Sequence, residues 1–167
     1  MSKILITGGA GFIGSQLGYQ LDKEGHDVIL LDNMSYGRLD NLVINGKTFA
    51  TFVGMDIRNK DIYSIMEGID YVFHLAGIAP LPDCQSDPYS AIDVNVSGTA
   101  NVLDAARYHG VKRVIFSSTS AVYENNQKFP CTEKDDVSPS LIYPNTKLQS
   151  EMLCKSYVDT YGLDIVI

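Results

Sequence analysis

Short apolar runs alternate with amphipathic segments along the whole chain. Six of the apolar runs have the length of a β-strand, and they cover residues 3–7, 26–32, 49–56, 70–77, 111–119 and 163–167. Intervening segments carry apolar residues at helical spacing, over residues 16–24, 58–68, 86–110 and 139–162. The two periodicities predict strands that alternate regularly with helices.

The order of these elements predicts an α/β fold class. Strands that are apolar throughout are typical of a parallel sheet with helices on both faces. Six β/α units with a glycine-rich first turn favour a doubly wound parallel sheet, the Rossmann fold, with strand order 3-2-1-4-5-6. Residues 1–167 are expected to form one domain, because their number matches the usual domain size.

Two of the predicted helices carry signals at their ends. Asp87 is expected to be the N-cap of the helix over 86–110, with Pro88 at the first helical position and Gly110 at the C-terminal cap. The last helix is expected to begin near Leu141. Pro144 then falls in the first turn, where backbone N–H groups lack helical partners anyway.

The charge and the cysteines narrow the class of protein. The chain carries 13 Lys and Arg residues against 20 Asp and Glu residues, a formal net charge of −7, so nucleic acid and anionic membranes are not expected as partners. The three cysteines, Cys84, Cys131 and Cys154, are far apart and have no metal-site spacing, so no metal is expected. They are predicted to be reduced thiols of a cytoplasmic protein.

A glycine cluster follows the first predicted strand. The stretch "ITGGAGFIGSQL" contains Gly8, Gly11 and Gly14, and a pyrophosphate can approach backbone N–H groups closely where no Cβ intervenes. Asp32 ends the second strand, where a carboxylate can accept both ribose hydroxyls of an adenosine and repel a 2′-phosphate. Because Asn33 follows it, and no Arg or Lys stands there, NAD is predicted over NADP. The alternative is a structural glycine turn with an unrelated ligand.

A second group of candidate residues lies downstream. Tyr143 and Lys147 stand four residues apart on a predicted helix, so their side chains share a face. A nearby ammonium favours the phenolate and brings a tyrosine toward the range of a useful base. The same pair also occurs by chance, as a half-buried ring beside a long amine. Ser118 and Thr119, at the carboxyl end of the fifth strand, are candidate hydroxyl donors to a substrate oxygen.

The chain resembles the extended short-chain dehydrogenase/reductase family, and within it the NAD-dependent nucleotide-sugar epimerase and dehydratase branch. The resemblance extends from Lys3 to Ile167. It rests on an ordered set of motifs: "TGGAGFIG", "LDN", "MDIR", "HLAG", "NVSGT", "FSSTSAVY" and "YPNTK" followed by a glutamate. The ordered set is far more specific than any single motif.

The resemblance implies a role for each matching residue. The implied cofactor-binding residues are Gly8, Gly11, Phe12, Ile13, Gly14, Asp32, Asn33, Asp56, Ile57, Leu75, Ala76, Gly77, Asn95, Tyr143 and Lys147. The implied catalytic residues are Tyr143 as the base, Lys147 as the group that binds the nicotinamide ribose and lowers the pKa of the tyrosine, and Thr119 with Ser118 as hydroxyl partners.

The implied activity is that of an NAD-dependent nucleotide-sugar epimerase. Tyrosinate would take a proton from a sugar hydroxyl while hydride leaves C4 for NAD, and return of the hydride to the other face of the 4-keto sugar would complete the epimerisation. Dehydratases of this family have an Asp-Glu pair directly after the threonine. Ser120 and Ala121 stand there instead, which favours a 4-epimerase or a plain dehydrogenase. Glu124 is a further departure, because glycine is common at its position.

Members of this family are about twice as long as this chain. A small C-terminal substrate domain is therefore expected to be absent, and the chain is interpreted as a truncated cofactor domain that retains its catalytic residues. A nucleotide sugar, UDP- or another NDP-linked sugar, is the expected substrate. The helices over 88–109 and 141–161 are those that the family uses for a two-fold dimer, so a homodimer is expected.

Other functions remain open at this point. A dehydratase, decarboxylase or dehydrogenase of the same family is one alternative. A non-catalytic NAD-binding module on the same fold is another, although a pure binder has no need of Thr119, Tyr143 and Lys147 together. A steroid- or flavonoid-type reductase is a third, disfavoured because such reductases usually prefer NADP.

Overall fold

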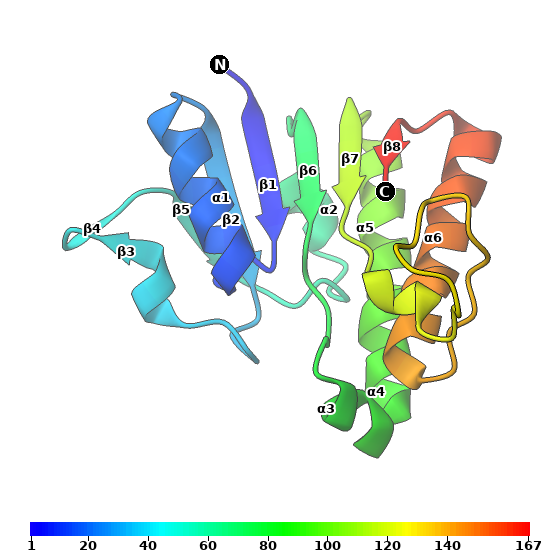
Figure 1. Cartoon of the computed structure of the whole chain (residues 1–167). Helices are drawn as coiled ribbons and strands as arrows, with labels where there is room; N and C mark the ends of the chain where they lie inside the picture. Colours follow the sequence, from blue (N-terminus) through cyan, green and yellow to red (C-terminus); the bar gives the residue numbers. More distant parts are fainter.

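The computed structural model describes all residues, 1–167, and its centre is a six-stranded parallel sheet (Figure 1). The strands are β1 (Lys3–Thr7), β2 (Asp27–Asp32), β5 (Thr51–Gly54), β6 (Tyr71–His74), β7 (Arg113–Phe116) and β8 (Ile165–Val166). Their order across the sheet is β5-β2-β1-β6-β7-β8, and every neighbouring pair is parallel. The predicted order 3-2-1-4-5-6 and the Rossmann fold class are confirmed.

Helices lie on both faces of this sheet. They are α1 (Phe12–Lys23), α2 (Ile62–Met66), α3 (Leu81–Ser86), α4 (Pro88–Ile92), α5 (Thr99–Tyr108) and α6 (Ile142–Tyr161). Short 3₁₀ turns occupy Leu39–Leu42 and Ser120–Tyr123, and a small hairpin pairs β3 (Val43–Ile44) with β4 (Lys47–Thr48). No helix in the chain combines the length and the apolar character needed to cross a membrane.

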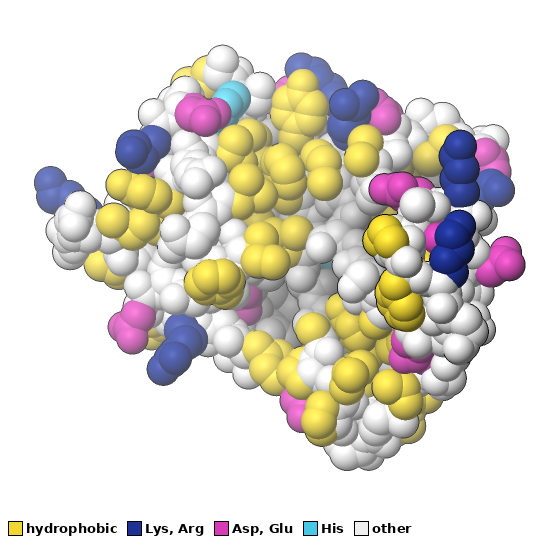
Figure 2. Space-filling view, in the orientation of Figure 1, with side chains coloured by type: hydrophobic (Ala, Val, Ile, Leu, Met, Phe, Trp, Pro, Cys, Tyr) yellow, Lys and Arg dark blue, Asp and Glu magenta, His cyan; other side chains and the backbone are white.

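Strand residues alternate between two hydrophobic clusters, one on each face. Leu5, Leu31 and Val72 belong to the larger cluster, together with buried residues of α2, α5 and α6. Ile4 and Ile6 belong to the smaller cluster, beneath α1. Figure 1 shows α1 in front of β2 and beside β1, with α5 behind the other half of the sheet and α6 next to β8 at its edge. Apolar side chains gather on the front of that half, where no helix covers them (Figure 2).

Several predicted bounds were wrong, each for a local reason. Helix α1 begins at Phe12 rather than at residue 16. The apolar pattern missed this first turn because Phe12 and Ile13 are 83% and 65% exposed and do not belong to the buried face of the helix. The segment 58–68 is helical only over Ile62–Met66, since Asn59 Oδ1 accepts from the N–H of Asp61 at 2.9 Å and forms a competing turn.

The predicted long helix over 88–109 is helical throughout but not uniformly α-helical. The Asp87 side chain caps its start by accepting from the N–H of Ser90 at 3.1 Å, as predicted, and Pro88 is the first residue of α4. The middle of the helix, Asp93–Gly98, is π-helical. Such segments are frequent at functional sites, and this one contains Asn95.

Candidate cofactor cleft and active site

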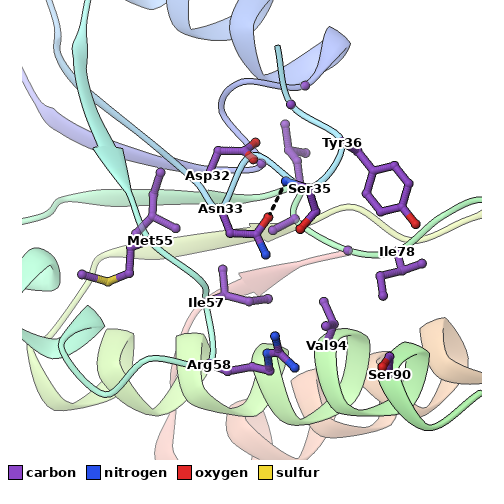
Figure 3. Close-up of a pocket in the computed structure, with 17 residues that line it drawn as sticks. Asp32, Asn33, Ser35, Tyr36, Met55, Ile57, Arg58, Ile78, Ser90 and Val94 are labelled. Carbon is purple, nitrogen blue, oxygen red and sulfur yellow. Dashed lines mark hydrogen bonds between the residues drawn. The ribbon is translucent and has the colours of Figure 1, made fainter. Parts of the chain in front are cut away.

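A cleft of about 460 Å³ opens at the carboxyl ends of β1, β2, β5 and β6. This is where the crossovers from the central strand β1 diverge, and open α/β sheets place their ligands at such a point. Figure 3 shows the loop after β2 on one side of the cleft, with Ile57, Arg58 and Val94 on the other. The lining residues are Gly8, Gly11, Leu31, Asp32, Asn33, Ser35, Tyr36, Gly37, Met55, Ile57, Arg58, Leu75, Ala76, Gly77, Ile78, Ser90 and Val94.

The glycine turn forms the floor of the cleft between β1 and α1. Gly8 has φ of +72°, a conformation that L side chains rarely adopt, and a Cβ there would lie 2.8 Å from the backbone N of Ala76. A Cβ on Gly14 would lie 2.3 Å from the carbonyl oxygen of Gly8. Glycine at these positions therefore lets β1, β6 and the start of α1 approach one another, and it leaves the backbone of Gly8 and Gly11 facing the cleft.

The carboxylate of Asp32 is fixed at the end of β2. One oxygen accepts from the N–H of Ala10 at 3.0 Å and the other from the N–H of Met34 at 2.8 Å. The residue is only 8% exposed, yet it lines the cleft. Asp32 thus presents an oriented negative charge next to the glycine turn, as a partner for ribose hydroxyls requires.

A charged cluster holds the end of the cleft beyond β5. Asp56 accepts from the Nδ2 of Asn33 at 2.8 Å and pairs with the guanidinium of Arg58, which also reaches Asp93 at 2.7 Å. The hydrogen bonds from Arg58 hold the pKa of the Asp56 carboxyl well below its usual range. Because Asp56 is occupied in this way, the side chains that line the cleft here are Ile57 and Arg58.

A buried histidine connects the glycine turn to the π-helical segment. His74 accepts at Nδ1 from the hydroxyl of Thr7 over 2.7 Å, and its Nε2 lies 2.9 Å from Oγ1 of Thr99. Thr99 donates its own hydroxyl proton to the carbonyl of Asn95 at 2.6 Å, so the histidine must donate from Nε2. Complete burial lowers the pKa of His74 to about 3, which keeps the ring neutral.

Asn95 links this network to the catalytic helix. Its side chain accepts from the N–H of Ile78 at 2.8 Å and donates to the carbonyl of Ile78 and to Oγ1 of Thr146, each at 3.0 Å. Its backbone carbonyl also accepts from the hydroxyl of Ser150. Asn95 therefore joins the segment after β6 to α6 at the level of Tyr143 and Lys147.

Lys147 is a buried cation on α6. The residue is only 7% exposed, and its Nζ lies 4.2 Å from the centre of the Phe116 ring. Burial lowers the pKa of Lys147 to about 8, and the charge of Glu151 one turn later counteracts part of that effect. Tyr143 is half-buried one turn earlier on the same helix. The four-residue spacing places both residues on the same side of α6, as the sequence predicts.

The candidate hydroxyls follow β7, which lies beside β6 and β8. Ser118 donates from Oγ to Glu151 on α6, so its hydroxyl proton is already used. Thr119 accepts at Oγ1 from the N–H of Ala121 and starts the 3₁₀ turn Ser120–Tyr123, which leaves its hydroxyl proton available. Of the two, Thr119 is therefore the better donor to a substrate oxygen.

The predicted residues fall into four groups in the structure, the smallest of which is the exposed pair Phe12 and Ile13 at the start of α1. Those that line the cleft are Gly8, Gly11, Asp32, Asn33, Ile57, Leu75, Ala76 and Gly77. Those that do not line it are Phe12, Ile13, Gly14, Asp56, Asn95, Ser118, Thr119, Tyr143 and Lys147. Among the latter, Gly14, Asp56 and Asn95 support neighbours of the cleft, whereas Ser118, Thr119, Tyr143 and Lys147 form the separate candidate catalytic group.

Sequence reasoning missed part of the lining. Met55 and Arg58 flank the predicted pair Asp56–Ile57, and Ser35, Tyr36 and Gly37 follow the predicted Asp32–Asn33. Met55 and Arg58 belong to the motif "MDIR", whereas for Ser35, Tyr36 and Gly37 the signal was their position directly after Asp32 and Asn33. Ser90 and Val94 enter from the far side through the helix that contains Asn95.

Comparison with known proteins bears directly on this site. The model of the NAD dependent epimerase/dehydratase family matches residues 4–167. The chain belongs to this family. Its members are NAD-dependent, so the prediction of NAD as the cofactor is confirmed at the level of the family.

Three individual relatives are similar to this chain over nearly its whole length. A putative UDP-glucose 4-epimerase of Methanocaldococcus jannaschii is 35% identical over 98% of this chain and 53% of its own length. The UDP-N-acetylglucosamine 4-epimerase of Methanobrevibacter ruminantium, solved with UDP-N-acetylmuramic acid, superposes with a TM-score of 0.92 at 34% identity, over 98% of this chain and 53% of that one. DesIV, a dTDP-glucose 4,6-dehydratase of Streptomyces venezuelae solved with NAD, gives 0.91 at 32% identity over the same shares. The chain thus spans about half the length of these relatives.

The cleft fits the cofactor of the family. A dinucleotide needs a backbone surface free of Cβ atoms for its pyrophosphate and an acceptor for its ribose. Gly8 and Gly11 supply the first, and the oriented carboxylate of Asp32 supplies the second. Ile57 and Met55 supply an apolar contact at the end of the cleft beyond β5.

Proposed function

We propose that this chain carries the cofactor site and the catalytic residues of an NAD-dependent nucleotide-sugar 4-epimerase. The observation that supports this most strongly is the buried ammonium of Lys147 over the ring of Phe116, one helical turn from Tyr143. Burial of a cation costs free energy. A module that only binds a dinucleotide gains nothing from that cost, whereas a base catalyst gains a positive charge that can stabilise a phenolate.

The residues of the chain divide the work of the reaction among them. NAD supplies reversible acceptance of hydride when it is bound. Tyr143 takes the proton of the sugar C4 hydroxyl, and Lys147 stabilises the phenolate that does so. Thr119 donates its free hydroxyl proton to the same sugar oxygen and orients it. Asp32 and the glycine turn hold the adenosine half, and Asn95 keeps α6 in register with the segment after β6.

The reaction within the family is a further part of the proposal. A 4,6-dehydratase needs an additional acid and base to remove water. The two residues after Thr119, where this family carries them, are Ser120 and Ala121 in the 3₁₀ turn, and neither can serve. An epimerase, whose only base can be Tyr143, is therefore favoured over a dehydratase. Similarity to DesIV keeps a dehydratase as the second candidate.

The substrate, the oligomeric state and the cellular location are further parts of the proposal. A UDP-sugar is the proposed substrate, since two of the three relatives named above carry the names of UDP-sugar 4-epimerases. A two-fold dimer through the helices over 88–109 and 141–161 remains a proposal. A cytoplasmic location is proposed because all three cysteines are free thiols.

The first experiment titrates the 167-residue chain calorimetrically with NAD and, in parallel, with NADP. Saturable binding of NAD with at least tenfold weaker binding of NADP is expected, because the Asp32 carboxylate repels a 2′-phosphate. The variant Asp32→Asn should reduce the difference between the affinities for NAD and NADP. Equal binding of both dinucleotides by the unaltered chain would contradict the role of Asp32.

The second experiment tests the base. Protein that joins this chain to a C-terminal substrate domain is incubated with NAD and UDP-glucose or UDP-N-acetylglucosamine, and the C4 epimer is detected by proton NMR. Tyr143→Phe is expected to keep NAD binding and to slow epimerisation by about 10²- to 10⁴-fold, the usual contribution of a general base. A Tyr143→Phe variant that epimerises the sugar at the unaltered rate would contradict the assignment of Tyr143 as the base.

A further inference from the structure

The cofactor cleft has two walls that are each fixed independently. The first is the loop after β2. The N–H of Arg38 donates to the carbonyl of Ala10 at 3.1 Å, and the Nδ2 of Asn41 donates to the same carbonyl at 2.8 Å. Gly37 packs so closely that a Cβ would lie 2.8 Å from Oδ1 of Asp32. This loop is therefore attached to the glycine turn and moves with it.

The second wall is the segment after β6 that ends at Ile78, and the short helix α3 follows it and holds it in place. Buried Cys84 donates from Sγ to the carbonyl of Ile78 at 3.4 Å, which holds α3 against the segment that lines the cleft. Gln85 accepts at Oε1 from the N–H of Ile142 at 3.0 Å. Ile142 is the residue directly before Tyr143. Helix α3 is thus attached to the start of the catalytic helix.

One hydrogen bond joins the first wall to the helix that holds the second. The hydroxyl of Tyr36 donates to Oδ2 of Asp83 on α3 at 2.6 Å, across 47 residues of sequence. Tyr36 lines the cleft, and in Figure 3 its hydroxyl points toward the segment of Ile78 at one end of it. This bond raises the pKa of Tyr36. No other hydrogen bond connects residues 33–41 with α3.

We propose that Tyr36 and Asp83 form a strap across the cleft that retains the bound dinucleotide. The inference rests on the proposed function. A 4-epimerase removes a hydride and returns it through the same cofactor molecule, so loss of the cofactor between the two transfers leaves a keto sugar unreduced. A ligand that lies between two anchored walls leaves more slowly while a bond joins them. Because the bond can open without unfolding either wall, the strap also allows loading.

The test measures release of NADH, whose fluorescence changes on leaving a protein. The 167-residue chain is loaded with NADH and mixed rapidly with a large excess of NAD, and the release rate is recorded for the unaltered chain, Tyr36→Phe, Asp83→Ala and the double variant. Each single variant is expected to release NADH about three- to tenfold faster, the effect of one partly exposed hydrogen bond to a charged group. Association rates should stay within twofold. The double variant should release NADH no faster than the singles, because both changes break one bond.

The control is Tyr108→Phe, which removes the hydroxyl of another exposed tyrosine, one that makes no hydrogen bond and lies on α5 away from the cleft. Tyr36 is 54% exposed, so its phenylalanine variant is expected to fold, and circular dichroism verifies this. Unchanged release from Tyr36→Phe, or strictly additive effects in the double variant, would overturn the strap alone. An unaltered chain that binds no NADH would overturn the cofactor site and the strap with it.

Discussion

The ammonium of Lys147 lies 4.2 Å from the centre of the Phe116 ring. The aromatic face compensates part of the desolvation of this cation, but burial still lowers the pKa of Lys147 to about 8 from its ordinary 10.5. A charged lysine at this position therefore lowers the free energy of unfolding of the chain. Such a conflict between stability and local chemistry is typical of functional sites.

The variant Lys147→Met should be more stable than the unaltered chain at pH 7. The depressed lysine pKa means that the unfolded chain binds more protons between pH 8 and 10.5, so the cost is fully present below pH 8 and disappears as pH rises to 10.5. Removal of the charge should raise the free energy of unfolding by about 1 to 3 kcal/mol at pH 7, and by nothing above pH 10.5. Urea unfolding at several pH values measures this.

The matched control is Lys155→Met, on the exposed face of the same helix. It should change the free energy of unfolding little at any pH. A stability gain at Lys155 equal to that at Lys147 would show that the effect comes from the helix and not from burial.

His74 predicts a second pH dependence, in the acid range. Its pKa of about 3 against an ordinary 6.5 means that the unfolded chain takes up a proton which the folded chain refuses. The free energy of unfolding should therefore fall by about 1.4 kcal/mol per pH unit between pH 5.5 and 4 through this residue alone. His74→Gln should lower stability at pH 7, because two buried hydrogen bonds are disturbed, but remove that part of the slope.

The comparison for this prediction is His26→Gln, at a partly exposed position near the start of β2. The acid slope of the His26 variant should resemble that of the unaltered chain. If both variants lose the same part of the slope, the burial of His74 is not its cause.

Much of the cleft could be predicted because its residues lie at the ends of strands. Asp32 ends an apolar run, and a glycine turn that precedes a helix has few other uses, so strand order and cofactor position follow from local patterns. The hairpin of β3 and β4 was missed although its turn, Asn45 and Gly46, has the positive φ angles of 52° and 75° that an Asn-Gly pair favours. That signal was present in the sequence.

Contacts between loops could not be predicted in the same way. The bond from Tyr36 to Asp83 and the buried bonds of His74 span 25 to 67 residues, and they depend on how neighbouring segments approach one another. No periodicity encodes that approach. The short helix α3 was missed for a related reason, since its six residues offer less than two turns of pattern.

The glycine turn gives a sharp steric prediction. A Cβ at Gly14 would meet backbone atoms of Gly8 and Gly9 at 2.3 to 3.0 Å, and backbone cannot move aside as a side chain can. Gly14→Ala should destabilise the chain by about 3 kcal/mol, the upper end of overpacking effects, and abolish NAD binding. Thermal unfolding and calorimetric titration measure the two effects.

Gly18, one turn later in α1, is the matched control. The nearest atom to a Cβ there is Cδ2 of Leu30 at 2.7 Å, the end of a side chain that can rotate. Gly18→Ala also gains helix propensity, worth about 1 kcal/mol. It should therefore cost far less stability and leave NAD binding intact, and equal losses in the two variants would contradict the steric argument.

Glu124 holds the segment that leads into helix α6, which carries Tyr143 and Lys147. The N-cap residue is Leu141, whose side chain cannot accept a hydrogen bond. Glu124 instead accepts at Oε1 from the N–H and hydroxyl of Ser140 and from the N–H of Leu141. These bonds lower the pKa of Glu124 below its ordinary 4.5. Glu124 thus fixes the two residues that precede the helix, while Gln85 accepts from the N–H of Ile142 at its first position.

Glu124→Ala should therefore loosen the first turn of α6. Amide exchange at residues 140–142 is expected to accelerate at least tenfold, while Glu133→Ala, which removes an exposed carboxylate in the same loop, leaves it unchanged. Because the folded pKa is depressed, the contribution of Glu124 to the thermal midpoint should be constant above pH 4.5 and decline as the pH falls through the folded value. Exchange at residues 140–142 that is insensitive to Glu124→Ala would contradict this role of Glu124.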